Sequence, residues 1–305
     1  IVYVLISLYN KTMIPRSKSD VGYLQEIYDV LAVAINILEE NMRTIHTDEI
    51  IKNIKEMCIE ANLSLTEDMK CRFKNATESE KSPLGKQILN QLQENMEIAA
   101  ADQIPICQDT GMAIVFLNIG QDVHIEGMDL HDAVNEGVRQ GYTEGGYLRK
   151  SVVKDPLIRE NTKDNTPAIM HIDIVPGEKL EILVAPKGFG SENMSRIFML
   201  KPADGEEGIK KSVIQAVKDA GPNACPPMVV GVGLGGSFEK AAFLAKKALT
   251  RNLDTPSEKP HIAKLEKELL EEINQLGIGP GGLGGSTTAL GLNIETYLHT
   301  LRECH

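Results

Sequence analysis

Pro105-Ile106-Cys107-Gln108-Asp109-Thr110-Gly111 is the stretch that decides how this chain is interpreted. A thiol, an amide, a carboxylate and a hydroxyl follow one another there, directly before the apolar run 113–117. We expect these groups to project from a short loop at the edge of a strand, because they are poor material for a hydrophobic core. The stretch predicts a metal ligand beside groups that hold a small substrate. An inert, half-buried cysteine is the simpler alternative.

A second cysteine stands in a similar setting. Asn223-Ala224-Cys225-Pro226-Pro227 lies directly before the apolar segment 228–231. The number of cysteines is odd and their spacing is wide, which favours a reducing compartment where thiols stay free or bind metal. We therefore expect a cytoplasmic protein. The five cysteines are Cys58, Cys71, Cys107, Cys225 and Cys304, of which the first two lie in predicted helices and are expected to be plain core or surface thiols.

Composition narrows the possible classes of function. The 305 residues are 25% charged and 42% hydrophobic, which is typical of a globular chain with ample length for a core. The net charge of -11 argues against non-specific nucleic-acid binding, so an anionic substrate would need a local cationic pocket. The apolar segment 1–9 is too short to span a membrane and lacks the flanks of a signal peptide, so we expect no membrane association.

The pattern of apolar and turn residues predicts a mixed α/β fold with a helical N-terminal region. Loops at strand ends are expected to carry the chemistry. The expected helices cover residues 21–40, 47–60, 83–101 (capped by Ser82), 129–140, 206–220, 238–249 (capped by Ser237) and 261–276, and the expected strands cover 168–175, 180–185 and 228–232.

Three glycine-rich segments could approach a ligand. Lys187-Gly188-Phe189-Gly190-Ser191 follows a predicted strand, and its backbone N–H groups could face an anion. The segment 231–236 fits G-x-G-x-x-G, and Asp254 follows Gly231 by 23 residues, so a nucleotide-dependent oxidoreductase remains an alternative. Residues 279–286 faintly resemble a phosphate loop, but Gly285 stands where the essential lysine would be.

Several separated blocks together carry a family resemblance. The chain resembles, from about Met42 to His299, the alpha subunit of the two-subunit iron–sulfur hydro-lyases, which are class I fumarate hydratase and its relative L-tartrate dehydratase. The order of the blocks matches as well as their content. The resemblance implies a main domain, residues 42–305, preceded by an extension, residues 1–41, that lies outside the family pattern. They cover residues 58–62, 82–85, 105–111, 147–151, 164–167, 191–195, 200–205, 225–227 and 283–285.

The resemblance implies a [4Fe-4S] cluster with three cysteine ligands and one open iron. Cys107 and Cys225 match two of these ligands, and Cys304 is the only candidate for the third. The chain departs from the family here, because Cys304 stands only five positions after His299, where the family has a longer apolar stretch. A stray thiol in an altered tail is the alternative for Cys304.

The resemblance also implies the groups that hold the substrate. Arg149 and Gln108 would bind carboxylates, and the planar fork of an arginine suits that task. Asp109 would orient the substrate hydroxyl or an iron-bound water, with a turn-forming role as the alternative. His299 would lie close to the substrate, or else be an exposed loop histidine.

The glycine loop at residues 187–191 departs from the family at one position. The family has three consecutive glycines there, and Phe189 replaces the middle one between Gly188 and Gly190. Its side chain would narrow the pocket, and it would clash if the position needs a positive φ.

The function implied is reversible hydration of fumarate to (S)-malate. The base and further anion-binding groups of this family come from a beta subunit, so the chain is expected to be incomplete alone and to work in a hetero-oligomer on a small dicarboxylate. L-Tartrate dehydratase is the alternative within the class. Outside it, we keep the nucleotide-dependent oxidoreductase and a cluster-free structural partner of the beta subunit.

Overall fold

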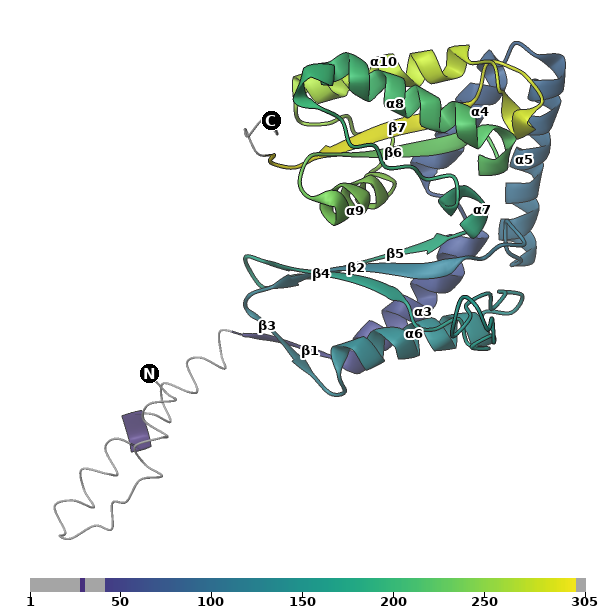
Figure 1. Cartoon of the computed structure of the whole chain (residues 1–305). Coiled ribbons are helices and arrows are strands. Elements are labelled where there is room, and N and C mark those ends of the chain that lie inside the picture. Colours follow the sequence, from purple (N-terminus) through teal and green to yellow (C-terminus); the bar gives the residue numbers. More distant parts are fainter. Residues whose placement is uncertain (1–27, 31–41, 300–305) are drawn as a thin grey trace, which may run out of the picture.

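The computed structural model describes residues 28–30 and 42–299. Residues 42–299 form two stacked halves joined along one side (Figure 1). One half is a three-stranded sheet with the strand order β4-β2-β5. The other is built on two parallel strands, β6 and β7. The mixed α/β class predicted from the sequence is confirmed.

The three-stranded sheet is centred on β2 (Met112–Gly120). It pairs in parallel with β4 (Ile169–Val175) and antiparallel with β5 (Leu180–Lys187). The turn between β4 and β5 therefore crosses the end of β2, where Asp122 N–H donates to the carbonyl of Gly177 at 3.0 Å. Because Met112 is paired with Lys187, the start of β2 and the end of β5 lie at the same edge.

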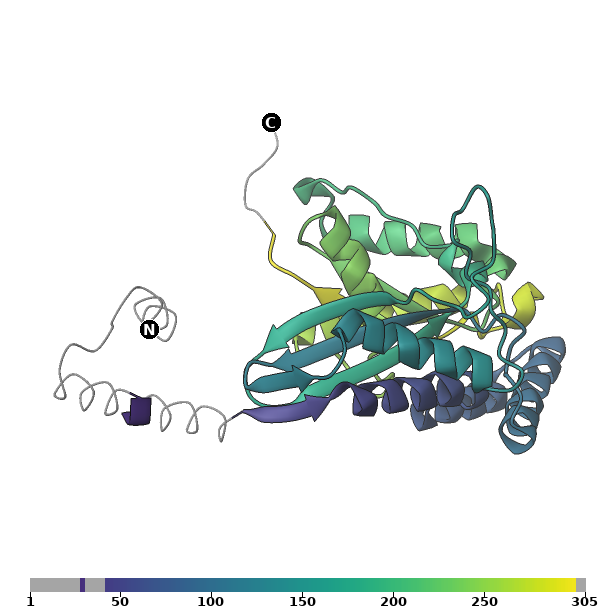
Figure 2. The ribbon, with the colours of Figure 1, turned by 90° about the horizontal axis from the view of Figure 1, so that it is seen from below.

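Two helices cover one face of this sheet, α3 (Thr47–Leu63) and α6 (Leu130–Glu144). Figure 2 shows them side by side from below. A Cβ atom at Gly137 or Gly141 would lie 2.8 Å from the Cβ of Ile54 or Cys58, so glycine permits this close contact. Burial raises the pKa of the Cys58 thiol to about 12, which makes it an unreactive core residue as expected.

A helical pair follows α3 and leads to the Cys107 loop. In α4 (Glu67–Ser79), Cys71 is exposed. The next helix, α5 (Pro83–Asp102), starts as predicted, with the Ser82 hydroxyl accepting the Gly85 N–H at 3.2 Å. It runs along the side of both halves in Figure 1 and ends just before the Cys107 loop.

In the second half, β6 (Met228–Leu234) pairs with β7 (Ala289–Thr296). Three helices pack around these strands: α9 (Phe238–Ala248) on one side, and α8 (Gly205–Ala220) and α10 (Pro260–Gln275) on the other (Figure 1). The core between α8, α10 and the strands contains Val217, Leu265, Leu269, Ile273, Leu292 and Ile294.

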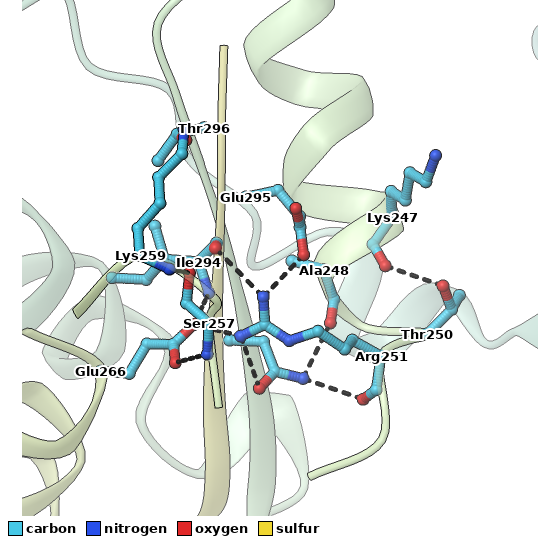
Figure 3. A network of polar contacts seen from close by, with 11 residues as sticks. Lys247, Ala248, Thr250, Arg251, Ser257, Lys259, Glu266, Ile294, Glu295 and Thr296 are labelled. Carbon is cyan, nitrogen blue, oxygen red and sulfur yellow. Dashed lines mark hydrogen bonds and ion pairs between the residues drawn. The ribbon is translucent and has the colours of Figure 1, made fainter. Parts of the chain in front are cut away.

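A polar network fixes the loop that connects α9 to α10 (Figure 3). The Arg251 guanidinium contacts Glu266 and donates to the Glu295 carboxylate at 2.7 Å. Buried Glu266 also accepts the N–H groups of Ile294 and Ser257, at 2.8 and 3.1 Å. A buried carboxylate paired in this way connects the loop to β7 without an unsatisfied charge.

The elements predicted from the sequence are present wherever they fall in the described residues. The Ser237 cap is different, since its hydroxyl contacts Glu239 and accepts no backbone N–H of α9. Most of the predicted helix at 21–40 lies outside the described residues, although 28–30 are helical. The sequence did not predict α4, β7, or the parallel pair of β1 (Arg43–His46) and β3 (Val123–Glu126). In the part of the chain that the structure describes, no helix has both the length and the apolar character to cross a membrane.

Candidate functional site

The Cys107 loop is fixed at its base and open at its tip. Ile106 N–H donates to the carbonyl of Asn62 at 2.9 Å, and the Asn95 amide donates to the Ile106 carbonyl at 2.9 Å. Beyond this anchor, Cys107 and Gln108 are exposed. Because α3 and α5 hold the backbone, the thiol is presented to solvent on a rigid support.

Asp109 connects this loop to the segment after β5. One carboxylate oxygen accepts the N–H of Gly111 and the other accepts the N–H of Phe189, each at 3.0 Å. A Cβ atom at Gly188 would lie 2.9 Å from the Asp109 carboxylate, so the close approach depends on glycine. The bond to Gly111 is the turn-forming role considered for Asp109. The hydrogen bond from Phe189 joins the Cys107 loop, residues 105–111, to the glycine loop at residues 187–191.

Arg149 is held beside the same loop through its backbone. Thr110 is 2% exposed, and its hydroxyl accepts the Arg149 N–H at 3.0 Å and donates to the Arg149 carbonyl at 2.8 Å. The Tyr142 hydroxyl donates to the Thr110 carbonyl at 2.7 Å. The Arg149 side chain is exposed, so its guanidinium is available to an anion at this edge of the sheet.

A buried asparagine supports the segment that follows Arg149. Asn165 has a φ of 64°, and its side-chain oxygen accepts the N–H groups of Ser151 and Val152 at 2.8 and 3.2 Å. Its amide nitrogen donates to the Gly111 carbonyl at 2.9 Å. Asparagine tolerates this left-handed backbone and satisfies three backbone groups at once. Asn165 lies in one of the matched blocks, 164–167, but its sequence context alone did not predict this supporting role.

Cys225 ends a short 3₁₀ helix, η2 (Gly221–Ala224). Its φ is 54°, its N–H donates to the Pro222 carbonyl at 3.0 Å, and its thiol is exposed. A Cβ atom at Gly190 would lie 4.0 Å from the Asn223 carbonyl oxygen, so the short helix α7 (Phe189–Glu192) contacts η2. Asp109, α7 and η2 thus form a continuous connection between the Cys107 and Cys225 loops.

An ion-pair triad holds α7 in place. Glu192 contacts Lys246 of α9 and lies 3.6 Å from Lys187 of β5. Burial alone would raise the pKa of Glu192, but the hydrogen bond and charge of Lys246 and the charge of Lys187 lower it. Burial lowers the pKa of Lys187. The triad therefore joins both halves of the fold at the candidate site. The triad was not predicted from the sequence, because Glu192 and Lys246 are 54 positions apart along the chain.

Phe189 adopts an ordinary backbone conformation as the first residue of α7. The clash considered for this position, which depended on a positive φ, does not arise. Phe189 is 45% exposed, and its backbone N–H lies 3.0 Å from an Asp109 carboxylate oxygen. Since the Phe189 N–H already donates to Asp109, it is not free for an anion.

His299 lies apart from this set of residues. β6 and β7 are parallel, so both strands start at one end of the pair and finish at the other. Cys225 lies just before the start of β6 at Met228, whereas His299 lies just after the end of β7, which is paired with Leu234. Seven strand residues at about 3.3 Å each separate the two ends by roughly 20 Å. His299 is exposed there. Cys304 lies outside the described residues.

The glycine fingerprint at 231–236 has a packing role. Gly231 and Gly233 lie inside β6, where a Cβ atom would come within 2.3 Å of the Ala245 carbonyl oxygen and 2.0 Å of that of Ala241. They allow α9 to pack directly on the strand and do not form a phosphate-binding turn. Asp254, the expected ribose ligand, lies 2.9 Å from the Arg72 guanidinium. The nucleotide-binding alternative therefore has no structural support here.

The two exposed thiols fit an iron–sulfur cluster in the chemistry of their donors, because such clusters are held by cysteine thiolates. Cys107 and Cys225 lie on connected loops and form no disulfide. Within residues 28–30 and 42–299, no three His, Cys, Asp or Glu side chains converge on a common metal position. The described residues thus supply two candidate ligands.

Comparison with known proteins defines the class. A family model described as fumarate hydratase (Fumerase) matches residues 51–303. "Putative L(+)-tartrate dehydratase subunit alpha" of Methanocaldococcus jannaschii is 46% identical over 258 residues, which cover 83% of this chain and 88% of that protein. L(+)-tartrate dehydratase subunit alpha of Escherichia coli K12 is 33% identical over 252 residues, or 81% of each chain. The fold and these matches define a hydro-lyase. In particular, the chain belongs to the fumarate hydratase (Fumerase) family.

Proposed function

We propose that this chain is the alpha subunit of a two-subunit hydro-lyase that adds water to, or removes it from, a C4 dicarboxylate, with the hydration of fumarate to (S)-malate as its reaction. One observation carries the proposal: the Cys107 loop, the Arg149 segment, α7 and the Cys225 turn are joined at one edge of the fold by hydrogen bonds and close contacts. This reaction requires thiolates to hold the cluster, a guanidinium to bind a substrate carboxylate and a carboxylate to orient the hydroxyl group.

Cys107 and Cys225 would hold the cluster. Cys304 remains the candidate for the third ligand, and it would have to reach them from His299, five positions earlier, beyond the far end of β7. When bound, a [4Fe-4S] cluster with an open iron supplies a Lewis acid for the substrate hydroxyl. The rest of the site would come from the neighbouring side chains. Arg149 and Gln108 would each bind a substrate carboxylate, and Gly188 and Gly190 would allow its close approach to the backbone.

Asp109 would orient the hydroxyl group that is added or removed. Its carboxylate is restrained by the N–H groups of Gly111 and Phe189, so little motion is needed when substrate binds. Each oxygen keeps further acceptor capacity for a substrate hydroxyl. His299 follows the end of β7 that is paired with Leu234, away from Cys225, so we leave it out of this proposed set.

A beta subunit would complete the site. The names of the relatives end in "subunit alpha", and the exposure of Cys107, Gln108 and Arg149 leaves their edge of the fold open to a second chain. We assign to that subunit the base that removes a proton from the carbon next to the departing hydroxyl. The wide spacing of free cysteines supports a reducing compartment, and we propose the cytoplasm.

L(+)-Tartrate dehydration is the second candidate reaction. It is favoured by the names of the relatives quoted above, one of which is 46% identical to this chain. Tartrate carries one more hydroxyl group than malate, so a site for it needs one more hydrogen-bonding partner. Parallel assays of the assembled enzyme with fumarate, malate and L-tartrate separate the two candidates by their kcat/KM values.

Iron loading of single cysteine variants tests the proposal. Cys107→Ser and Cys225→Ser should each lose cluster iron after anaerobic reconstitution with the beta subunit present, because serine is a poor ligand for this cluster. Cys71→Ser is the matched control, since Cys71 is an exposed thiol on α4, and it should load like the wild type. Full loading of either of the first two variants would remove that cysteine from the ligand set.

A further inference from the structure

Glu80 is a buried carboxylate that the proposed reaction does not use. It ends α4 and is 6% exposed. One carboxylate oxygen accepts the N–H groups of Ser82 and Ser286, both at 2.8 Å, and the Ser286 hydroxyl at 3.1 Å. The other accepts the Ser286 N–H at 3.1 Å. A buried carboxylate needs such donors, and most of them come from a segment 206 positions away in the sequence.

The glycines on either side of this carboxylate are needed for its fit. A Cβ atom at Gly85 would lie 3.0 Å from the Glu80 carboxyl carbon, and one at Gly285 would lie 2.9 Å from a carboxylate oxygen. Gly285 also has a φ of 140°, which favours glycine. Glu80 is therefore enclosed between the start of α5 and the glycine-rich loop, which we define as residues 279–286.

The glycine-rich loop is stiff despite its composition. Gly284 N–H donates to the Ile278 carbonyl at 2.8 Å, and Gly282 N–H donates to the Gly279 carbonyl at 3.0 Å. Its start is held by the residue directly before β7, because the Gly279 N–H donates to the Thr288 hydroxyl at 3.2 Å. A displacement at one end of such a loop is transmitted to the other end.

The other end of the loop supports the Cys225 turn. Gly281 N–H donates to the Pro226 carbonyl at 2.8 Å. A Cβ atom at Gly282 would lie 2.4 Å from the Cβ of Pro222, the residue whose carbonyl accepts the Cys225 N–H. The loop thus contacts the chain on both sides of Cys225. The thiol itself stays exposed.

We propose that Glu80 is a positioning residue, which acts through the glycine-rich loop to hold the turn that carries Cys225. The inference rests on the proposed function, in which Cys225 binds the cluster. Burial alone would raise the pKa of Glu80, but the hydrogen bonds from Ser286, Ser82 and Thr287 outweigh burial and lower it to about 2. The carboxylate is therefore ionised, and its anchoring role intact, across the physiological range of pH.

Thiol reactivity of the iron-free full-length chain tests the inference without relying on the cluster. We would measure alkylation of Cys225 and Cys107 by iodoacetamide in the same sample, using peptide mass spectrometry. Glu80→Gln keeps the shape of the side chain but places an amide donor against backbone N–H groups. Freeing the loop should raise the Cys225 to Cys107 rate ratio at least about fivefold.

Asp68→Asn is the matched control. Asp68 is a similarly buried carboxylate on α4, and it accepts the Leu253 N–H at 2.8 Å in a different loop. It should leave the rate ratio unchanged. Gly282→Ala acts from the other end of the glycine-rich loop and should raise the ratio as Glu80→Gln does. If Glu80→Gln does not fold, Ser286→Ala removes one donor to the carboxylate and should raise the ratio by less.

The results separate the possible outcomes. An unchanged ratio in Glu80→Gln, or in Ser286→Ala if that variant replaces it, overturns the inference. An equal rise in Asp68→Asn also overturns it, because general loosening would then explain the effect. If the ratio rises as expected while Cys225→Ser still loads iron fully, the positioning of the turn stands and only the ligand role of Cys225 fails.

Discussion

Replacing Thr110 by valine tests whether Arg149 is fixed beside the Cys107 loop. Valine has nearly the same shape as threonine, so the change removes the hydroxyl without opening a cavity. That hydroxyl makes two hydrogen bonds to the Arg149 backbone, at 3.0 and 2.8 Å, and Thr110 as a whole is 2% exposed. The substitution therefore affects these two bonds and little else.

The expected cost follows from the two hydrogen bonds. Each contributes a net of about 0.5–1.5 kcal/mol, and a buried group left without a partner costs more, so Thr110→Val should lower the free energy of unfolding by about 2–3 kcal/mol. Thr143→Val is the matched control. Its hydroxyl donates to the Arg139 carbonyl at 2.7 Å on the exposed side of α6, and losing it should cost less than about 0.5 kcal/mol.

Urea unfolding of the full chain, followed by circular dichroism, measures both values. The wild type and the two variants would be compared under identical conditions. The slope of the unfolding free energy against urea concentration should be the same for all three. A Thr110→Val loss that matches the Thr143→Val loss would refute the reasoning, because the Arg149 backbone would then not depend on the buried hydroxyl.

Three further predictions address the site and its supports. Arg149→Ala should keep its iron content but lose about 2–5 kcal/mol of transition-state stabilisation in kcat/KM, and unchanged kinetics would remove it from the site. Gly233→Ala should cost about 1–3 kcal/mol in urea unfolding, because a Cβ atom would overlap the Ala241 carbonyl; no loss would contradict the close packing of α9. The pKa of Glu80 is lowered from 4.5 to about 2, so its contribution to stability is complete above pH 4.5 and is lost as the pH falls toward 2. The stability difference between wild type and Glu80→Gln should therefore shrink between neutral pH and about pH 3, and a constant difference would argue against an ionised Glu80.

Local signals in the sequence predicted the elements that local interactions determine. The cap at Ser82, followed by proline, correctly placed the start of α5 because capping is settled within one turn. The four-residue strands β1 and β3 are too short to show a period. β7 is buried along most of its length and includes buried Asn293, whose amide donates to the carbonyls of Ala248 and Arg251. Its sequence therefore lacks the alternation of a half-buried strand.

In the candidate site, too, local motifs were predicted from the sequence and contacts between distant residues were not. The order of the motif blocks was enough to predict the family, and the structure joins most of the predicted residues at one edge. The residues that hold them there were not predicted, because their contacts span the chain. Glu192 and Lys246 are 54 positions apart, and Glu80 and Ser286 are 206 apart. Single charges at such separations carry no pairing signal in one sequence.

His299 is the one described residue of the predicted site that the structure does not bring to the others. His299 matches a family position, but only five positions separate it from Cys304, where the family pattern has a longer stretch. The parallel register of β6 and β7 places it at the opposite end from Cys225. Motif matching gives the residue type, whereas the strand direction decides which end of the fold that residue occupies.

Anaerobic iron and sulfide analysis of the chain co-expressed with its beta subunit, combined with electron paramagnetic resonance, tests the central claim most directly. The account predicts about four irons and four sulfides per alpha chain. It also predicts, for the reduced cluster, a signal that changes when malate or L-tartrate is added, because an open iron is accessible to the substrate. Absence of iron, or a signal that neither compound alters, would contradict the assignment of an open-iron hydro-lyase.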